Sequence, residues 1–287
     1  MSSQPKHLLG IDTGGTFTDF VYYREGQLTL HKVLSTPAAP EQAILQGIAD
    51  LNVDLEDLLI VHGSTVATNA VLEGKGVRTV YITNHGFADV LAIGRQARAE
   101  LYKLQPAQIS APLDHEHCLE TGGRIAADGS VLEPLTADDL QQLNNEVASL
   151  QPQAVAINLL FSYLHPQLEQ QIADALPDDL FISRSSKVLP EAREYERGMT
   201  TWLNAWVGPL VQGYLQRLKQ QTQPAKLSIM HSAAGTIDAD QAGQLAVKLL
   251  LSGPAGGLMA ARSIGQQTGQ ARLMTFDMGG TSTDVAL

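Results

Sequence analysis

The stretch Asp12-Thr-Gly-Gly-Thr-Phe-Thr-Asp19 returns near the other end of the chain as Asp277-Met-Gly-Gly-Thr-Ser-Thr-Asp284. The two octets start 265 residues apart and agree at six of eight positions. An apolar run precedes each octet and another follows it, which predicts a strand, a tight Gly-Gly turn and a second strand. Such a hairpin offers an acidic ligand to a metal ion, and N–H and hydroxyl donors to phosphate oxygens. Two hairpins of this kind predict two lobes that grip one nucleotide.

The first octet supplies the groups that a nucleotide phosphate needs. We interpret Asp12 as a catalytic residue that holds Mg²⁺ through a bound water, because Mg²⁺ keeps several waters and takes few protein ligands. The glycines let the backbone approach phosphate oxygens closely. The predicted nucleotide-binding residues are Thr13, Gly14, Gly15, Thr16 and Thr18. The alternative is a simple tight β-turn, since Asp, Thr and Gly favour turns.

The second octet repeats these roles. Asp277 takes the part of Asp12 as a catalytic residue and Mg²⁺ ligand. The predicted phosphate contacts of this octet are Gly279, Gly280, Thr281, Ser282 and Thr283. The octet ends three residues before the sequence does. We therefore expect this sequence to hold one nearly whole lobe and only the opening hairpin of a second.

The composition excludes several classes of protein. The chain has 287 residues, a net charge of −11 and a pI near 5.1, which argues against nonspecific nucleic-acid binding. It contains one cysteine, Cys118, and hence no disulfide framework. No apolar run reaches the ~20 residues of a membrane span, and the first residues do not resemble a signal peptide. We expect a cytoplasmic protein that binds neither nucleic acid nor membrane.

Strand and helix patterns alternate along the chain, which predicts an α/β fold. Three strands of a meander are expected over residues 7–12, 18–24 and 28–34. Further strands are expected over 58–63, 77–83, 154–160 and 180–183, with a β-hairpin within 116–134. Helices are expected over 40–51, 64–73, 140–150, 167–176 and 195–218.

The block His62-Gly-Ser-Thr-Val-Ala-Thr-Asn69 lies where a predicted strand meets a predicted helix. Ligand contacts in α/β sheets usually occur at such junctions. His62 and Asn69 are therefore candidates for a cleft, with a purely structural role as the alternative. Ser64 and Thr65 are interpreted as caps of the helix. Ser64 is not expected to be a hydrolase nucleophile, because no Gly-x-Ser-x-Gly elbow surrounds it.

Three further segments attract attention by their composition. Arg95 is a candidate anchor for a carboxylate or a partner subunit, although an exposed loop would use the same residue. Leu251–Gly257 is expected to open a helix with Pro254 in its first turn, either for anion binding or for close packing. Asp114–Cys118 consists of potential metal ligands, but adjacent residues rarely converge on one ion, so we interpret it as a surface segment.

Five blocks occur in an order that resembles the hydantoinase A / 5-oxoprolinase family: 62–69, 94–96, 190–197, 251–257 and 276–284. The resemblance extends over almost the whole chain. It implies the ribonuclease H-like ATPase fold of actin, Hsp70 and sugar kinases, with two lobes that close on ATP and Mg²⁺. It also implies a hydantoinase/oxoprolinase N-terminal lobe over 1–185. Residues 186–287 would then begin a second domain that is cut off just after the second hairpin.

The resemblance also assigns roles within 190–197. It raises Glu194 as a catalytic residue and Arg197 as a cleft residue that orients substrate or water. The alternative is a solvated or salt-bridged start of a helix, because charges three or four residues apart share a helix face.

The reaction implied by the resemblance is the ATP-dependent opening of a small cyclic amide, such as 5-oxoproline or a hydantoin, by phosphorylation of the amide oxygen. A hydantoinase B-type subunit is the implied partner, and a homo-oligomer is compatible with the sequence. The alternatives are a subunit of an ATP-dependent carboxylase, a nucleotide-gated regulatory or chaperone-like protein of the actin fold, and an inactive fragment. Adenosine contacts in this fold come mostly from the second lobe, so a chain that ends at Leu287 is expected to bind ATP poorly.

Overall fold

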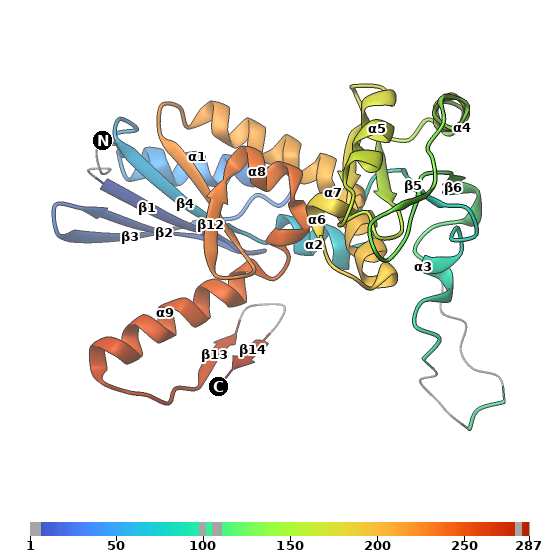
Figure 1. Ribbon diagram of the computed structural model, residues 1–287. Coiled ribbons are helices and arrows are strands. Elements are labelled where there is room, and N and C mark those ends of the chain that lie inside the picture. Colours follow the sequence, from blue (N-terminus) through green and yellow to red (C-terminus); the bar gives the residue numbers. More distant parts are fainter. Residues whose placement is uncertain (1–6, 98–101, 105–110, 279–282, 287) are drawn as a thin grey trace. The chain divides into compact units, whose positions relative to one another are not determined.

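The structure of the protein is a computed structural model that describes residues 7–97, 102–104, 111–278 and 283–286 (Figure 1). It consists of two compact units. Unit 1 comprises Met1–Lys75 and Leu210–Leu287, and unit 2 comprises Gly76–Pro209. The long helix α7 (Glu194–Gln221) contributes residues to both.

Unit 1 is built on a six-stranded mixed sheet with the order β12-β11-β4-β1-β2-β3. Its strands are β1 (His7–Thr13), β2 (Phe17–Arg24), β3 (Gln27–Leu34), β4 (Leu58–Ser64), β11 (Lys226–His231) and β12 (Gly235–Asp238). The antiparallel run β1-β2-β3 confirms the predicted meander. Strand β4 lies parallel to β1, and β11 lies parallel to β4.

The helices of unit 1 lie on both faces of this sheet. They are α1 (Pro40–Asp50), α2 (Val66–Leu72), α8 (Ala239–Gln244), α9 (Ser252–Thr268) and the 3₁₀ turn η2 (Ala246–Leu249), together with the end of α7. Helix α1 starts at Pro40 as predicted, because the first turn of a helix tolerates a missing N–H. A Cβ on Gly47 of α1 would come within 2.2 Å of the Phe20 ring, so only glycine lets α1 approach β2 this closely.

The face of the sheet under α1 and α7 forms the core of unit 1. Alternate side chains of the meander point into it, and Leu9, Ile11 and Phe20 are at most 3% exposed. An ion pair between Arg217 Nε of α7 and Glu41 Oε1 of α1, 2.6 Å long, joins the two helices. Helix α9 lies on the opposite face (Figure 1).

Unit 2 contains a four-stranded parallel sheet with the order β10-β9-β5-β6. Its strands are β5 (Thr79–Asn84), β6 (Cys118–Thr121), β9 (Ala154–Asn158) and β10 (Phe181–Arg184), and β7 (Arg124–Ile125) pairs with β8 (Val131–Glu133) outside this sheet. The predicted hairpin within 116–134 is therefore confirmed only for β7 and β8. Its first part, β6, joins the parallel sheet, because the apolar alternation of a short strand does not reveal its partner.

The helices of unit 2 complete its core. They are α3 (Val90–Ile93), α4 (Ala137–Leu150), α5 (Gln167–Ala175), α6 (Ser185–Val188), the 3₁₀ turn η1 (His115–His117) and the first part of α7. Thr136 and Asp139 cap the start of α4 reciprocally. Side chains of α4, α5 and the sheet form one buried apolar cluster around Ile157. On α7, the rings of Trp202 and Trp206 stack with their centroids 5.3 Å apart.

The second octet also forms a hairpin, as predicted. Strands β13 (Thr275–Met278) and β14 (Thr283–Ala286) are antiparallel, and Asp277 pairs with Asp284. In the first hairpin Asp12 pairs with Asp19. The two hairpins therefore share one register as well as one sequence pattern.

The fold is mixed α/β with parallel strands, which confirms the predicted class. Within the described part of the chain, no helix has the length and apolar character needed to cross a membrane. The expected division of the sequence into 1–185 and 186–287 stays a prediction, and so does the assignment to the actin-like ATPases.

Candidate functional site

The first hairpin ends in an exposed turn. Asp12 lies at the end of β1 and is exposed, and Gly14 N–H donates to the carbonyl oxygen of Phe17 at 3.0 Å. The N–H of Gly15 has no acceptor among the described residues, and a Cβ on Gly15 would meet nothing within 4 Å. Thr16 is exposed beside it. The turn thus presents a backbone donor, a hydroxyl and a carboxylate together, which suits a phosphate with a hydrated metal ion.

Two threonines of the octet face the other way. Because side chains alternate along a strand, Thr13 and Thr18 point toward the core of unit 1. The Thr18 hydroxyl is fully buried and lies 2.9 Å from Ser35 Oγ, which in turn donates to the carbonyl of Gly14 at 2.8 Å. Contrary to expectation, Thr18 therefore holds the turn in shape instead of facing a phosphate. Thr13 Oγ1 is buried and has no partner within the described residues.

Helix α2 is fastened to the end of β1 by a side-chain relay. Thr65 Oγ1 donates to the carbonyl of Thr13 at 3.0 Å, and Asn69 Nδ2 donates to Thr65 Oγ1 at 3.2 Å. Thr65 is the N-cap residue of α2, yet its side chain makes no capping bond. The predicted capping role is therefore wrong for Thr65. Asn69 is half-buried, and its amide orients the Thr65 hydroxyl that is bonded to the end of β1.

Helix α9 begins at the same place. Leu251 N–H donates to Thr68 Oγ1 at 3.1 Å, and Ser252 Oγ donates to the carbonyl of Ser64 at 3.3 Å. Leu251 has a φ of 58°, which is costly for a leucine and is sustained here by the bond to Thr68. A Cβ on Gly253 would meet nothing within 4 Å. Three separate sequence blocks, 12–19, 62–69 and 251–257, therefore meet at one end of the unit 1 sheet.

Two residues that the sequence did not single out shape the surroundings of Asp12. Asp19 lies directly across the ladder from Asp12 and forms an ion pair with Lys32, whose Nζ is 2.8 Å from Asp19 Oδ1. Gly63 leaves room for the carboxylate, because a Cβ there would lie 3.2 Å from Asp12 Oδ1. The sequence could have indicated a role for Asp19, since an aspartate ends both octets. It could not have indicated the role of Gly63, because that role depends on the pairing of β4 with β1.

His62 is part of the core of unit 1. Its side chain has no exposed surface; Nε2 lies 2.7 Å from Tyr214 Oη, and Nδ1 lies 3.4 Å from the carbonyl of Ile11. The structure thus places His62 beneath the sheet and not in an open cleft. Burial lowers the pKa of His62 to about 4, so its imidazole is neutral at physiological pH.

This burial makes the stability of unit 1 depend on pH. The pKa of His62 is lower in the folded chain than in the unfolded chain. As the pH falls below about 6.5, His62 is therefore protonated in the unfolded chain first, and this lowers the free energy of unfolding. Between pH 7 and pH 5 we expect the wild type to lose about 2 kcal/mol more unfolding free energy than His62→Gln, whose side chain does not titrate. Urea unfolding followed by circular dichroism checks this. Equal pH slopes for the two proteins would contradict it.

The second hairpin is described only in its strands. The structure gives the backbone of Asp277 and Thr283, but not their side chains. The other predicted phosphate contacts, Gly279, Gly280, Thr281 and Ser282, lie outside the described residues. The assignment of Asp277 and of this turn to a nucleotide stays a prediction.

Arg197 is buried inside unit 2. Its guanidinium donates through Nε to Asn158 Oδ1 at 2.8 Å, through Nη2 to the carbonyl of Leu159 at 2.7 Å, and through Nη1 to the carbonyl of Glu191 at 2.9 Å. The Tyr163 ring lies 5.4 Å from the guanidinium carbon. The side chain has no exposed surface. The structure therefore uses Arg197 to tie the start of α7 to the end of β9, which differs from the expected cleft position.

The other candidates of unit 2 lie nearer the surface. Arg95 and Glu196 form an ion pair, and the side chains of both are at least one-third exposed. Glu194 is the first residue of α7 and half-buried, and its carbonyl accepts a bond from Asn158 Nδ2 at 3.2 Å. The blocks 94–96 and 190–197 are thus neighbours in space. The catalytic role of Glu194 and the anchoring role of Arg95 stay predictions.

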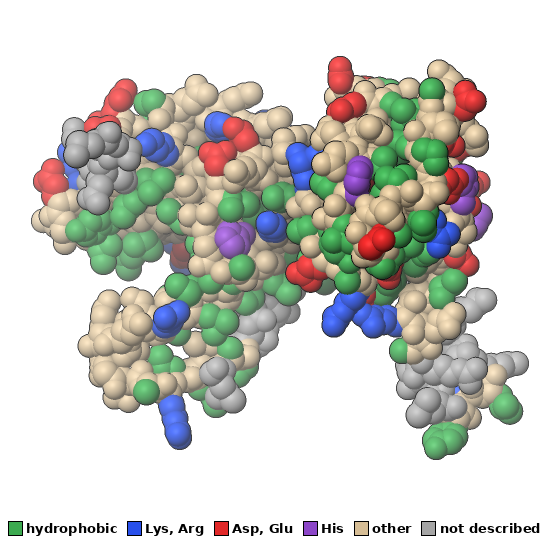
Figure 2. Space-filling model, viewed as in Figure 1, with side chains coloured by type: hydrophobic (Ala, Val, Ile, Leu, Met, Phe, Trp, Pro, Cys, Tyr) green, Lys and Arg blue, Asp and Glu red, His purple; other side chains and the backbone are tan. Residues whose placement is uncertain are grey.

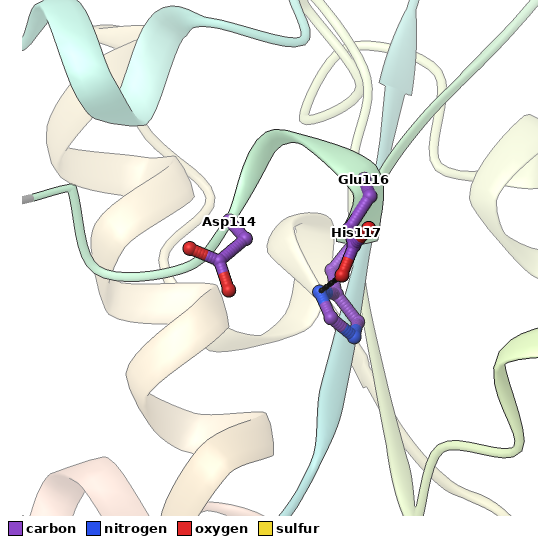
Figure 3. A group of neighbouring side chains, drawn as sticks. All are labelled: Asp114, Glu116 and His117. Atoms are coloured by element: carbon purple, nitrogen blue, oxygen red, sulfur yellow. Dashed lines mark ion pairs between the residues drawn. The ribbon is translucent and has the colours of Figure 1, made fainter.

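The segment before β6 brings potential metal ligands closer than expected. Ligand atoms of Asp114, Glu116 and His117 all lie within 4.8 Å of one another, and His117 Nδ1 is 3.9 Å from Glu116 Oε1 (Figure 3). Burial raises the pKa of the neighbouring Cys118 to about 11, which disfavours the thiolate that a metal would need. Both carboxylates are exposed, so the interpretation as a surface segment is retained.

Two family descriptions match this chain. "Hydantoinase/oxoprolinase N-terminal region" matches residues 8–179, and "Hydantoinase/oxoprolinase" matches residues 197–287. The chain belongs to the hydantoinase/oxoprolinase family. This confirms the resemblance that the sequence blocks carry.

Relatives within the hydantoinase/oxoprolinase family include enzymes of two kinds. The caprolactamase subunit alpha of Pseudomonas jessenii is 32% identical, over 99% of this chain and 44% of its own. The solved ATP-dependent caprolactamase from the same organism has a TM-score of 0.80 at 31% identity, over 97% of this chain and 43% of that chain. 5-oxoprolinase 1 of Arabidopsis thaliana is 29% identical, over 96% of this chain and 25% of its own.

The second kind is a carboxylating enzyme. The nucleotide-free structure of acetone carboxylase, an enzyme of ATP-dependent acetone carboxylation, has a TM-score of 0.82 at 25% identity, over 97% of this chain and 43% of that chain. The hydantoinase/oxoprolinase chain described here therefore spans less than half the length of each of these relatives. Both of these solved relatives are ATP-dependent enzymes, but one is a caprolactamase and the other carboxylates acetone.

Proposed function

We propose that this chain is part of an ATP-dependent hydrolase that opens a cyclic amide. The observation that supports this proposal most directly is that blocks 12–19, 62–69 and 251–257 meet at the end of β1. The exposed Asp12 carboxylate and the Gly15 N–H lie there at one turn. Caprolactamase and 5-oxoprolinase among the relatives support the substrate class. Since the chain spans less than half of these relatives, the activity is proposed for the assembled protein.

The residues at this turn fit a nucleotide phosphate and Mg²⁺. Asp12 would hold Mg²⁺ through a water, and Gly15 N–H and the Thr16 hydroxyl would donate to phosphate oxygens. A Cβ on Gly15 would meet nothing within 4 Å, so the turn leaves room for a phosphate. When bound, the metal ion would neutralise phosphate charge. The N-terminus of α9, which is bonded to Thr68 and Ser64, would add positive potential near this turn.

The proposed chemistry makes an unreactive amide carbonyl electrophilic. The amide oxygen attacks the γ-phosphorus of ATP and ADP leaves, so the amide carbon becomes bound to a phosphorylated oxygen. Water then adds to this carbon, the ring C–N bond breaks with proton transfer to nitrogen, and phosphate leaves on hydrolysis. Two waters are consumed overall. Catalysis of the phosphoryl transfer rests on positioning and charge neutralisation. The hydrogen-bonded turn would contribute the positioning, and the metal ion the neutralisation.

Acetone carboxylase among the structural relatives favours a second candidate, a subunit of an ATP-dependent carboxylase. The same turn would then serve phosphorylation of a ketone enolate or of bicarbonate. In either case we propose that the chain works with a hydantoinase B-type subunit, since caprolactamase and acetone carboxylase relatives are named as subunits.

The test uses the protein purified from its native source with the polypeptides that accompany it. Caprolactam, 5-oxoproline and hydantoin are each supplied with ATP and Mg²⁺, and ADP and ring-opened product are measured together. Acetone with labelled bicarbonate forms the second arm. ADP formation coupled to ring opening supports the hydrolase, and label incorporation without ring opening replaces it by the carboxylase. ATP consumption that no substrate stimulates contradicts both.

A further inference from the structure

One face of the unit 1 sheet is apolar and exposed over β1, β2 and β3. Register places its side chains in rows across the meander: Leu8 beside Tyr23 and Leu28, and Val21 beside Leu30. The surface, called the open face below, consists of Leu8, Phe17, Val21, Tyr23, Leu28, Leu30 and Leu34. Figure 2 shows hydrophobic side chains gathered over β2 and β3.

The open face is larger than chance exposure explains. Leu28, Leu30 and Leu34 are 66%, 75% and 69% exposed, although single exposed leucines are ordinary. The seven large side chains are between 38% and 75% exposed and present on the order of 600 Å² of apolar surface. This is the upper end of the range for the largest patch on a typical monomer, and such patches are often functional.

The rest of the sheet shows what kind of element belongs there. The opposite face is covered by helices α1 and α7, and on the same face α9 lies over β4 and β11, where its Gly256 approaches Met230 of β11. Strands β1–β3 are antiparallel, and the solvent-facing side of an antiparallel sheet is normally polar, unlike the open face. A helix beside α9 would complete this layer over β1–β3.

The solved relatives are more than twice as long as this chain. Caprolactamase and acetone carboxylase match this chain along 97% of its length, yet this match is only 43% of theirs. We propose that the open face binds an amphipathic helix from the part of the hydantoinase/oxoprolinase polypeptide that these relatives carry beyond the match. The apolar side of this helix packs on Leu28 and Leu30 of the edge strand β3. The interaction requires no nucleotide.

The experiment uses the full 287-residue chain and, as the probe, the unmatched part of the Pseudomonas jessenii caprolactamase subunit alpha made as a separate polypeptide. Hydrogen exchange of the chain is measured with and without the probe. We expect protection of peptides that cover β2 and β3. Leu28→Lys and Leu30→Lys should each weaken probe binding at least tenfold, whereas Leu132→Lys, at an exposed leucine of β8, leaves it unchanged.

All three leucines are exposed, so the variants should keep the wild-type circular dichroism and thermal midpoint. Absence of protection in β2 and β3, whether the probe binds elsewhere or not at all, overturns the proposal. Protection that persists in Leu30→Lys overturns it as well. Self-association of the chain alone that Leu30→Lys abolishes would assign the open face to a second copy, and would also overturn it.

Discussion

Asp12→Ala is expected to lower ATP-dependent turnover of the assembled enzyme by at least ~10³-fold. The carboxylate stands at the exposed end of β1, and Gly63 leaves the space that it occupies. Without it, the proposed metal ion would lose its orienting ligand, and charge neutralisation is a dominant contribution to phosphoryl transfer. ADP formation under saturating substrate is the measurement.

The matched control is Asp178→Ala, which removes an exposed aspartate of unit 2 that has no part in the turn. It should keep the wild-type rate, and both variants should keep the wild-type thermal midpoint, since both side chains are exposed. Asp12→Asn separates charge from shape, because it keeps the size of the side chain and removes the charge. If Asp12→Ala retains a rate within about threefold of the wild type, the assignment of the first hairpin to the phosphates is wrong.

Arg197→Met should lower the free energy of unfolding of unit 2 by about 3–5 kcal/mol. The change leaves Asn158 Oδ1 and two backbone carbonyls in the interior without their donor, and buried acceptors that lose a charged partner are costly. Both tryptophans of the chain lie in unit 2, on α7. Urea unfolding followed by tryptophan fluorescence therefore reports on the affected unit.

Arg193→Met is the matched control, because Arg193 lies four residues before Arg197, just ahead of α7, and is exposed. Its effect should stay within about 0.5 kcal/mol. Arg197→Lys should fall between the two, since a lysine can replace part of the fork of donors but not its geometry. A loss below about 1 kcal/mol in Arg197→Met would show that the buried guanidinium is not the link between α7 and β9.

Local pattern predicted the elements of this fold well. The meander, α1, α7 and both octet hairpins follow from alternation, a proline at a helix start and glycines at turns, all of which are properties of neighbouring residues. The course of β6 could not be predicted in this way. Its four residues fit a hairpin and a parallel sheet equally well, and only the packing of unit 2 decides between them.

In the candidate site, too, local features were predicted correctly and roles that depend on distant partners were not. Asp12 and Gly15 lie at an exposed turn, as their types and spacing predicted. The capping role predicted for Thr65 was wrong, and the sequence left His62 open between a cleft and a structural role. Both roles depend on partners that are far away in sequence, namely the carbonyl of Thr13 and the hydroxyl of Tyr214. A threonine before a helix looks like a cap, and a histidine at a strand end looks like a ligand, unless the tertiary partner is known.

The shared register of the two hairpins limits how this protein can change. In each hairpin six residues separate two paired aspartates. Removing or adding one residue in the first turn would move every side chain of β2 to the opposite face of the sheet, so that Phe20 would leave the core and Val21 would enter it. We therefore expect this turn to tolerate neither insertions nor deletions. Its chemistry can change only through substitutions that keep its length.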